Sequence, residues 1–156
     1  MILNNGRNAF AYLNTNTKRG LKALDGTVNN NNTSSNVFST YWSYVTLLIG
    51  NGNTPTSAND YALESEITEN VTVTVVSRTD TSVNRTYDNA SLPLLFLNTI
   101  VSNDGTDDIE VKELGILIKA SATATNDNKF LLTRKVLSDT LVFEAGKSYQ
   151  IRVEIN

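Results

Sequence analysis

The sequence contains no cysteine and no histidine among its 156 residues. Without cysteine, disulfide bridges and cysteine-based metal or redox sites are excluded. Without histidine, the chain lacks the most common general acid or base and the most common metal ligand, so neither a Ser-His-Asp nor a Cys-His arrangement can form. These two absences remove many of the usual routes to catalysis.

Positive charge is also scarce, because 13 Lys and Arg residues stand against 16 Asp and Glu residues, for a net charge of -3. Lys18, Arg19 and Lys22 form the only small basic cluster, whereas a nucleic-acid-binding domain usually shows a basic patch. No apolar run is long enough to span a membrane. The first ten residues, MILNNGRNAF, lack the pattern of a signal peptide. We therefore expect no nucleic-acid partner, no membrane partner and no cleaved leader.

The sequence is instead rich in Asn and Thr, which favour turns and half-buried strands. The segments ENVTVTVVSR and SYQIRVEIN alternate apolar and polar residues, as a strand with one buried face does. LPLLFLNTIVSN is mostly apolar and predicts a central strand buried on both faces. Turn-rich connectors separate the segments, and no long amphipathic helix is apparent. The pattern predicts a mostly β protein, an antiparallel β-sandwich of Ig-like or jelly-roll-like type.

Two hairpins are expected within this sandwich, one in FLNTIVSNDGTDDIEVKELGI and one at the C-terminus, where the chain turns at Gly146. The predicted core residues are Val73, Val75, Leu95, Leu97, Ile116, Ile118, Ile151 and Val153.

Residues 1–40 differ in composition from residues 41–156, which we take as the β-sandwich domain. The stretch GTVNNNNTSSN is polar and almost uncharged, so it cannot bury itself alone. We expect residues 1–40 to form an extended N-terminal arm that lies across neighbouring subunits. The arm residues expected to dock on a partner are Phe10, Tyr12, Leu21 and Leu24.

A pair of glycines, Gly50 and Gly52, follows an apolar run in LLIGNGNTPTSANDYALESEI. A phosphate-binding loop would need a following Gly-Lys-Ser/Thr, and a dinucleotide fingerprint would need a third glycine and a helix. Neither is present. The two glycines are better explained by a strand end and a turn with positive φ.

Three groups of side chains could carry chemistry, and each has a plainer explanation. Glu64 and Glu66 share one face of an expected strand, but a glycosidase pair also needs a cleft and a set separation, and solvated surface charges are favoured. Trp42 and Tyr44 could stack on a sugar, although aromatic residues of a sandwich are more often core. The loop 103–113 could supply oxygen ligands to Ca²⁺ or could be an acidic hairpin tip; its acidic residues are Asp104, Asp107, Asp108, Glu110 and Glu113.

Three segments resemble small β proteins of tailed-phage particles, such as tail-collar and other virion proteins. LLIGNGNTPTSANDYALESEI is similar to their Gly-x-Gly segment with a later Asp-x-Ala-Leu. IEVKELGILIK is similar to their Glu-hydrophobic-Gly strand, and FLLTRKVLSDTLVFEAGKSYQIRVEI to their Arg-x-Val-Leu strand and final turn and strand. The resemblance covers Leu47 to Ile155, with a gap around VVSRTDTSVNRTYDNASLP.

The resemblance implies a non-enzymatic structural protein of a phage virion, assembled in the host cytoplasm. Its expected partners are further copies of itself and capsid or tail proteins, as a head decoration or a tail or collar component. We expect no catalytic, cofactor-binding or metal-binding residues. The alternative is a carbohydrate-binding or adhesin-type β-sandwich module.

Overall fold

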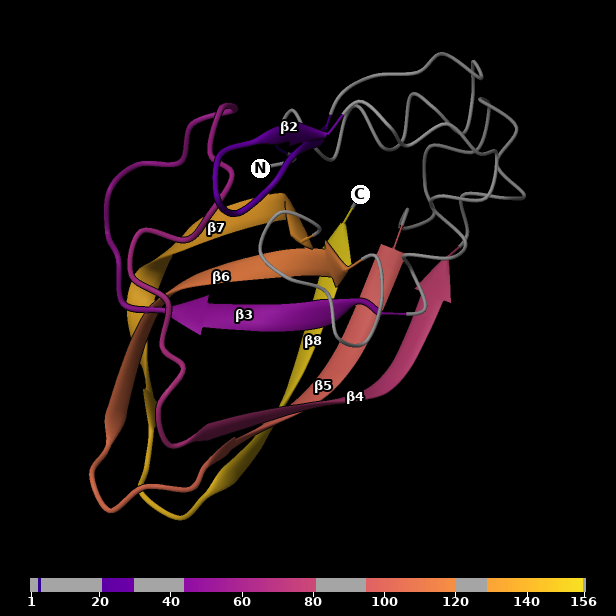
Figure 1. Cartoon of the computed structure of the whole chain (residues 1–156). Coiled ribbons are helices and arrows are strands. Elements are labelled where there is room, and N and C mark those ends of the chain that lie inside the picture. The colour runs from indigo at the N-terminus through magenta and orange to yellow at the C-terminus, as the bar shows by residue number, and fades with distance from the viewer. Residues whose placement is uncertain (1–2, 4–20, 30–43, 81–94, 120–128, 156) are drawn as a thin grey trace. The chain divides into compact units, whose positions relative to one another are not determined.

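The computed structural model describes residues 3, 21–29, 44–80, 95–119 and 129–155 of the chain (Figure 1). All regular structure in this part is β-strand, so it offers no helix that could cross a membrane. The strands are β1 (Leu21–Lys22), β2 (Val28–Asn29), β3 (Thr46–Gly50), β4 (Val71–Asp80), β5 (Leu95–Asn103), β6 (Ile109–Lys119), β7 (Lys129–Phe143) and β8 (Ser148–Ile155). The expected mostly β, antiparallel class is confirmed.

The strands form one two-stranded sheet, β1-β2, and two three-stranded sheets with the orders β3-β6-β7 and β4-β5-β8. The chain divides into two compact units. Unit 1 comprises Met1–Ile67 and Val111–Leu141, and unit 2 comprises Thr68–Glu110 and Val142–Asn156. The expected boundary between residues 40 and 41 lies outside the described residues.

The core of unit 1 forms around the apolar strand β3, TLLIG, which pairs with β6. A cluster of buried leucines lies beside it, made of Leu3, Leu48, Leu63, Leu117 and Leu131. Leu3 comes from the N-terminal segment, and its backbone N–H donates to the Leu132 carbonyl at 3.0 Å. The beginning of the chain therefore contributes to the core of its own unit.

Leu21 and Leu24 also pack within unit 1. Leu21 is only 3% exposed, and Leu24 packs against the leucine cluster. The Leu24 N–H donates to the Lys129 carbonyl at 3.0 Å, which ties this segment to β7. The sequence placed these two leucines on a partner, whereas the structure packs them within unit 1. Phe10 and Tyr12 lie outside the described residues, and their docking on a partner stays a prediction.

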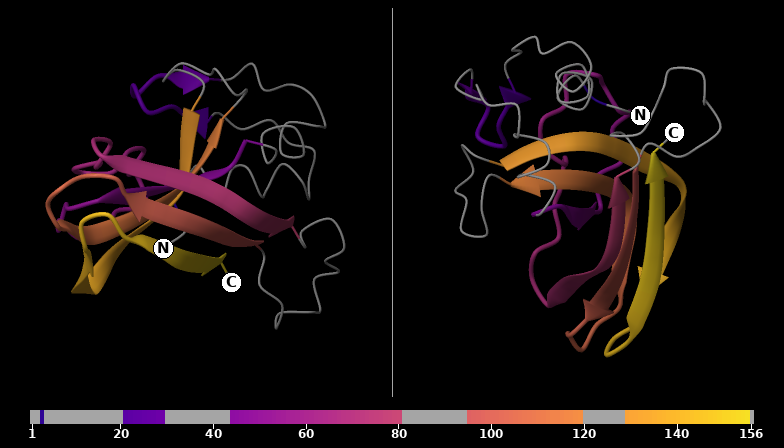
Figure 2. Two further views of the ribbon diagram at one scale, coloured as in Figure 1. Left: turned by 90° about the horizontal axis from the view of Figure 1, so that it is seen from below. Right: turned by 90° about the vertical axis from the view of Figure 1, so that its right-hand side faces the viewer.

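In unit 2, β5 is the central strand, with β4 and β8 as the two edges (Figure 2). The predicted alternation is present: the valines of β4 at positions 71, 73 and 75 are half-buried, and Thr72 and Thr74 are exposed. On β5, Leu97 and Val101 are fully buried but Ile100 is 39% exposed. The prediction that both faces of this strand are buried is wrong, because the cross-strand neighbours of Ile100 are the exposed polar residues Thr74 and Gln150.

The predicted core is correct in part. Leu97, Ile116 and Ile118 are buried, as expected. The other members that the structure describes are only half-buried, because they lie on edge strands with a neighbouring strand on one side; these are Val73, Val75, Ile151 and Val153. The side chain of Leu95 lies outside the described part.

Both predicted hairpins are wrong. β5 and β6 follow each other in sequence but belong to different sheets, and so do β7 and β8. The turns themselves exist, since Gly146 has a φ of 68° and the Lys147 N–H donates to the Glu144 carbonyl at 3.2 Å. A tight turn of this kind reverses the chain without dictating which strand the next segment pairs with.

We expect Leu97→Ala to lower the free energy of unfolding by about 2–5 kcal/mol, because the residue is fully buried and truncation leaves a cavity. Ile100→Ala on the same strand is the matched control and should cost less, because that side chain is 39% exposed. Urea denaturation at equilibrium measures both. Equal losses for the two variants would contradict the one-sided burial of β5.

Candidate functional site: a buried charged cluster around Arg134

Two charged side chains point inward from neighbouring strands of unit 1. Glu113 on β6 has no exposed side-chain surface, and Arg134 on β7 has 4%. The Arg134 Nε donates to Glu113 Oε2 at 2.7 Å. A buried carboxylate is costly to remove from water unless an opposite charge and hydrogen bonds compensate it. Each of these two residues therefore needs the other as its charge partner.

The loop that follows β3 completes the cluster with two more carboxylates. The Arg134 Nη1 donates to Asp60 Oδ2 at 2.8 Å, and its Nη2 lies 3.6 Å from Glu64 Oε2. The guanidinium thus meets acidic groups along three of its nitrogens. We define the Arg134 cluster as Arg134, Glu113, Asp60 and Glu64.

The carboxylates of the Arg134 cluster also accept hydrogen bonds from the loop backbone. Glu113 Oε1 accepts the Ser65 N–H at 2.8 Å, and Glu113 Oε2 accepts the Glu64 N–H at 3.3 Å. Glu64 Oε2 in turn accepts the Thr54 N–H at 2.8 Å, and Glu64 Oε1 accepts the Thr54 hydroxyl. These bonds fasten the end of the loop 51–65 to β6 and join the beginning of the loop to its end.

The two glycines that the sequence singled out border this carboxylate. A Cβ at Gly50 would lie 2.5 Å from the Ser65 carbonyl oxygen and 2.6 Å from Glu113 Oε1. A Cβ at Gly52 would lie 2.7 Å from the same Glu113 oxygen. Among the described glycines, positive φ is found at Gly26 and Gly146 and at neither Gly50 nor Gly52. Gly50 does end β3, as expected, but the expected positive φ was wrong, and close approach to Glu113 is what excludes a side chain.

The electrostatics agree with a stabilising role for the cluster. Burial alone would lower the pKa of the Arg134 guanidinium, but hydrogen bonds to Asp60 and Glu113 and the charges of both raise it above its usual value. The Thr54 hydroxyl and then the Thr54 N–H lower the pKa of the Glu64 carboxyl, with a further contribution from Arg134. Arg134 therefore stays charged, and Glu64 ionises at lower pH than an ordinary glutamate.

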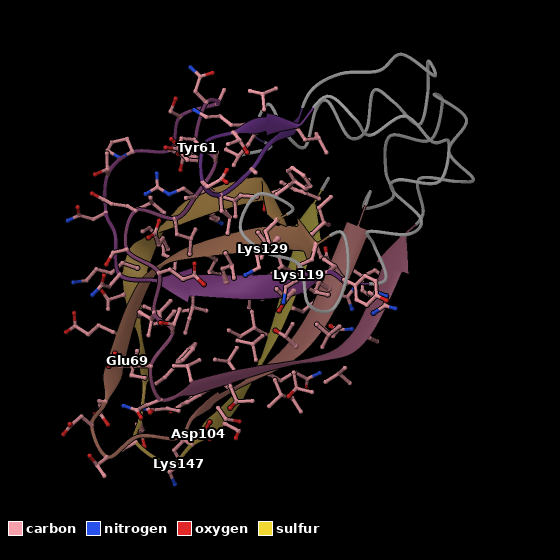
Figure 3. All side chains as sticks on the ribbon, viewed as in Figure 1. Tyr61, Glu69, Asp104, Lys119, Lys129 and Lys147 are labelled. Carbon is pink, nitrogen blue, oxygen red and sulfur yellow. The ribbon has the colours of Figure 1, made fainter. Side chains whose placement is uncertain are left out.

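Glu66 behaves in the opposite way. Although the residue as a whole is exposed, its carboxyl group is partly shielded from water, and this desolvation raises its pKa. Lys129 and Lys119 oppose the shift, and Glu113 adds to it. Lys119 is the last residue of β6, and Lys129 is the first residue of β7 (Figure 3).

Glu64 and Glu66 were expected on one strand, but the structure shows no strand there. A single bridge joins Glu66 to Gly50, and the flanking residues are irregular. Glu64 belongs to the Arg134 cluster, whereas Glu66 is placed by its backbone beside β3. The two carboxylates therefore lie in separate environments that the sequence spacing did not reveal.

The acidic loop 103–113 is divided between the two units. Glu113 belongs to the Arg134 cluster in unit 1, and the other acidic residues of the loop belong to unit 2. Asp104 Oδ2 accepts the Thr72 hydroxyl at 2.6 Å, and Asp108 Oδ1 accepts the Ala145 N–H at 2.9 Å. Within the part of the chain that the structure describes, no three acidic side chains are grouped to hold a metal ion.

The remaining candidates fall partly outside the described ranges. Trp42, Lys18 and Arg19 lie outside them. Tyr44 is 39% exposed. Lys22 places its ammonium group 3.8 Å from the centre of the Tyr61 ring, a cation–π contact within unit 1.

Sequence reasoning missed Asp60 and Arg134 as members of one site. The available signal was that Glu113 and Arg134 each stand two positions from an apolar residue, Val111 and Leu132, and so fall on an apolar face of their strands. Such a charge is rarely buried without a partner. Comparison of the chain with protein-family models, curated proteins and solved structures found no match.

We expect Arg134→Met to lower the free energy of unfolding by about 3–5 kcal/mol, because it leaves Glu113 buried and unpaired. The control is Arg152→Met, which removes a 2.6 Å ion pair with Glu154 whose side chains are 55% and 43% exposed; such a pair contributes less than about 1 kcal/mol. The double variant Arg134→Met/Glu113→Leu should recover much of the loss, measured by urea denaturation. A double variant less stable than Arg134→Met would contradict this account.

Glu64 and Glu66 should give opposite pH dependences of stability. Glu64 has a lowered pKa, so it stabilises the fold above the ordinary value of 4.5 and loses that effect as the pH falls through its lowered value. Glu66 has a raised pKa, so its favourable contribution is complete below 4.5 and is lost as the pH rises through its raised value.

Thermal denaturation between about pH 3 and about pH 7 tests this difference, because ordinary carboxyl groups titrate within that interval. Relative to the parent protein, Glu64→Gln should be less stable at the upper end and lose that deficit at the lower end. Glu66→Gln should be more stable at the upper end. Parallel profiles for the two variants would show that the environments are not distinct.

Proposed function

We propose that this chain is a non-enzymatic structural protein of a tailed-phage virion, assembled in the host cytoplasm. It would associate with further copies of itself and with capsid or tail proteins, as a head decoration or a tail or collar component. The proposal needs no cofactor and assigns no catalytic or metal-binding residue.

One observation carries the proposal: the three segments that resemble virion proteins meet at the Arg134 cluster. The Gly-x-Gly segment supplies Gly50, Gly52 and Asp60, the Glu-hydrophobic-Gly strand supplies Glu113, and the Arg-x-Val-Leu strand supplies Arg134. Residues that stand far apart in the sequence thus form one contact network. A motif set of this kind is explained by the fold it stabilises, which supports a structural role over a reactive one.

A second contact extends the same network. A Cβ at Gly115, the glycine of the Glu-hydrophobic-Gly strand, would lie 2.7 Å from Leu131 Cδ1 and 2.9 Å from Leu63 Cδ2. Leu63 is the leucine of the Asp-x-Ala-Leu pattern, and it is buried in the leucine cluster. The glycine lets β6 approach that cluster closely, so the small residue of the pattern also serves packing.

We further propose that the two three-stranded sheets belong to an antiparallel β-sandwich, Ig-like or jelly-roll-like. Each sheet supplies the apolar face that such a fold requires. In unit 1 this face includes Leu47 and Ile49, and in unit 2 it includes Leu97 and Val101, all nearly or fully buried.

A carbohydrate-binding or adhesin-type module is the second candidate function. It is favoured by Tyr44, a large aromatic residue that is 39% exposed and therefore open to stacking on a sugar. Binding of the purified chain to a glycan array, lost in Tyr44→Ala and kept in Tyr149→Ala, would favour this candidate. Tyr149 is the control because its ring is stacked on Phe143 at a centroid distance of 4.8 Å.

The virion role predicts that the protein is a stoichiometric part of phage particles. Antibodies raised against the purified chain should label particles from the strain that carries its gene, at regular positions on the head or tail, in immunogold electron microscopy. The same particles, purified and analysed by mass spectrometry, should contain the chain at a constant ratio to the major capsid protein. Particles that are complete yet lack the chain would overturn the proposal.

A further inference from the structure

The edge strand β4 has a composition that is unusual for an edge. It runs for ten residues, Val71–Asp80, and pairs with β5 on one side, while none of the described residues pairs with its other side. Its first seven residues, VTVTVVS, include no charge, no proline and no glycine. Proteins usually protect such an edge with lysine, proline, a β-bulge or a very short strand, and of these devices the described part of β4 has only a bulge, between Val75 and Ser77. The opposite edge, β8, does carry charges, with Arg152 paired to Glu154.

We propose that β4 pairs antiparallel with β4 of a second copy of this chain, about a two-fold axis that passes beside Val73 perpendicular to the sheet. In an antiparallel pair, residues that face each other point to the same side of the sheet. Centred on Val73, the pairing sets Val73 opposite itself, Thr72 opposite Thr74, and Val71 opposite Val75. Each pair then joins side chains of one kind, with the half-buried valines on one face and the exposed threonines on the other.

Charge complementarity agrees with the same register. Glu69 precedes β4 and is exposed (Figure 3). Arg78 lies near the end of β4 and is also exposed. The pairing of β4 with β5 shifts by one residue between Val75 and Ser77, so Val76 is the extra residue of a β-bulge. Counting outward from Val73 and omitting Val76, the end of β4 that carries Arg78 in one copy comes beside the turn that carries Glu69 in the other. The two-fold axis produces this contact twice.

The exposure of the residues on and beside β4 also agrees with a second strand at its outer edge. Val76 is 55% exposed, and Ile100 on the neighbouring strand is 39% exposed. The valines at 71, 73 and 75 are half-buried, although they lie on the apolar face of the sheet. A second β4 would cover the outer flank of these valines and pair the free backbone groups of the edge. An isologous contact of this kind closes as a dimer and does not propagate.

This pairing goes beyond the proposed virion role, and it rests on that role only in that an assembling subunit needs such a surface. It is tested on the purified full-length chain with no phage component present. Failure of the dimer therefore leaves the particle-labelling experiment unaffected, and absence from particles leaves the dimer unaffected.

The absence of native cysteine makes a disulfide test direct, since any bridge in a single-cysteine variant must join two copies. Under mild oxidation, Val73→Cys should form a covalent dimer in high yield, because the residue faces itself. Val71→Cys and Val75→Cys are matched controls on the same face of the same strand, and each alone should stay largely uncrosslinked. An equimolar mixture of the two controls should crosslink. Equal yields for all three single variants, or none for Val73→Cys, would overturn the register.

A second test changes the charge of the edge strand β4 and measures the mass of the protein in solution. Light scattering and sedimentation should give the mass of a dimer for the parent protein, and Thr72→Lys/Thr74→Lys should shift it to a monomer, because lysines then face lysines. Ser148→Lys/Gln150→Lys adds the same charge at the same spacing to β8 and should leave the dimer intact. Glu69→Arg should weaken the dimer, and Glu69→Arg/Arg78→Glu should restore it. A monomeric parent protein, or dissociation by the β8 variant alone, would overturn the proposal.

Discussion

The buried carboxylate of Glu113 constrains the elements around it in unit 1. An ionised group without exposed surface costs several kcal/mol to desolvate, so every neighbour must either compensate it or leave room for it. Arg134 supplies the charge, and the Ser65 and Glu64 N–H groups supply hydrogen bonds. Gly50 and Gly52 leave the room. The course of the loop 51–65 follows from these requirements, since it must present two amides to one side chain.

The cluster is more valuable for specificity than for net stability. A buried ion pair repays its desolvation only when the geometry is good, and an apolar replacement of both partners is often no less stable. What an apolar pair cannot do is select one conformation of a fifteen-residue loop. Asp60 and Glu64 hold the guanidinium from the loop side, and Thr54 holds Glu64. A loop fixed by charges at several points presents one constant surface.

The sequence predicted strands well and their partners badly, for a physical reason. Alternation records which side of a strand is buried, and it identified β4 and β8 with the correct faces. Turn residues record only that the chain reverses, and at Gly146 and in the loop after β5 the reversal leads to a different sheet. The cluster was hidden for the same reason. Arg134 meets Glu113 across 21 positions and Asp60 across 74 positions, and no local pattern encodes a contact of that range.

The same physical rule, that polar groups need partners, acts differently in unit 2. On the exposed face of the sheet β4-β5-β8, short side chains satisfy one another across strands: Ser102 and Ser148 share a hydrogen bond of 2.7 Å, and Asn98 donates to Ser77 at 2.8 Å. A face whose polar groups are already paired gains little from a polar ligand. The backbone of β4 is different, because the outer side of an edge strand keeps donors and acceptors that side chains of the strand do not reach. Another strand matches that spacing, and the uncharged segment VTVTV at the start of β4, which is symmetric about Val73, is compatible with a second copy of itself.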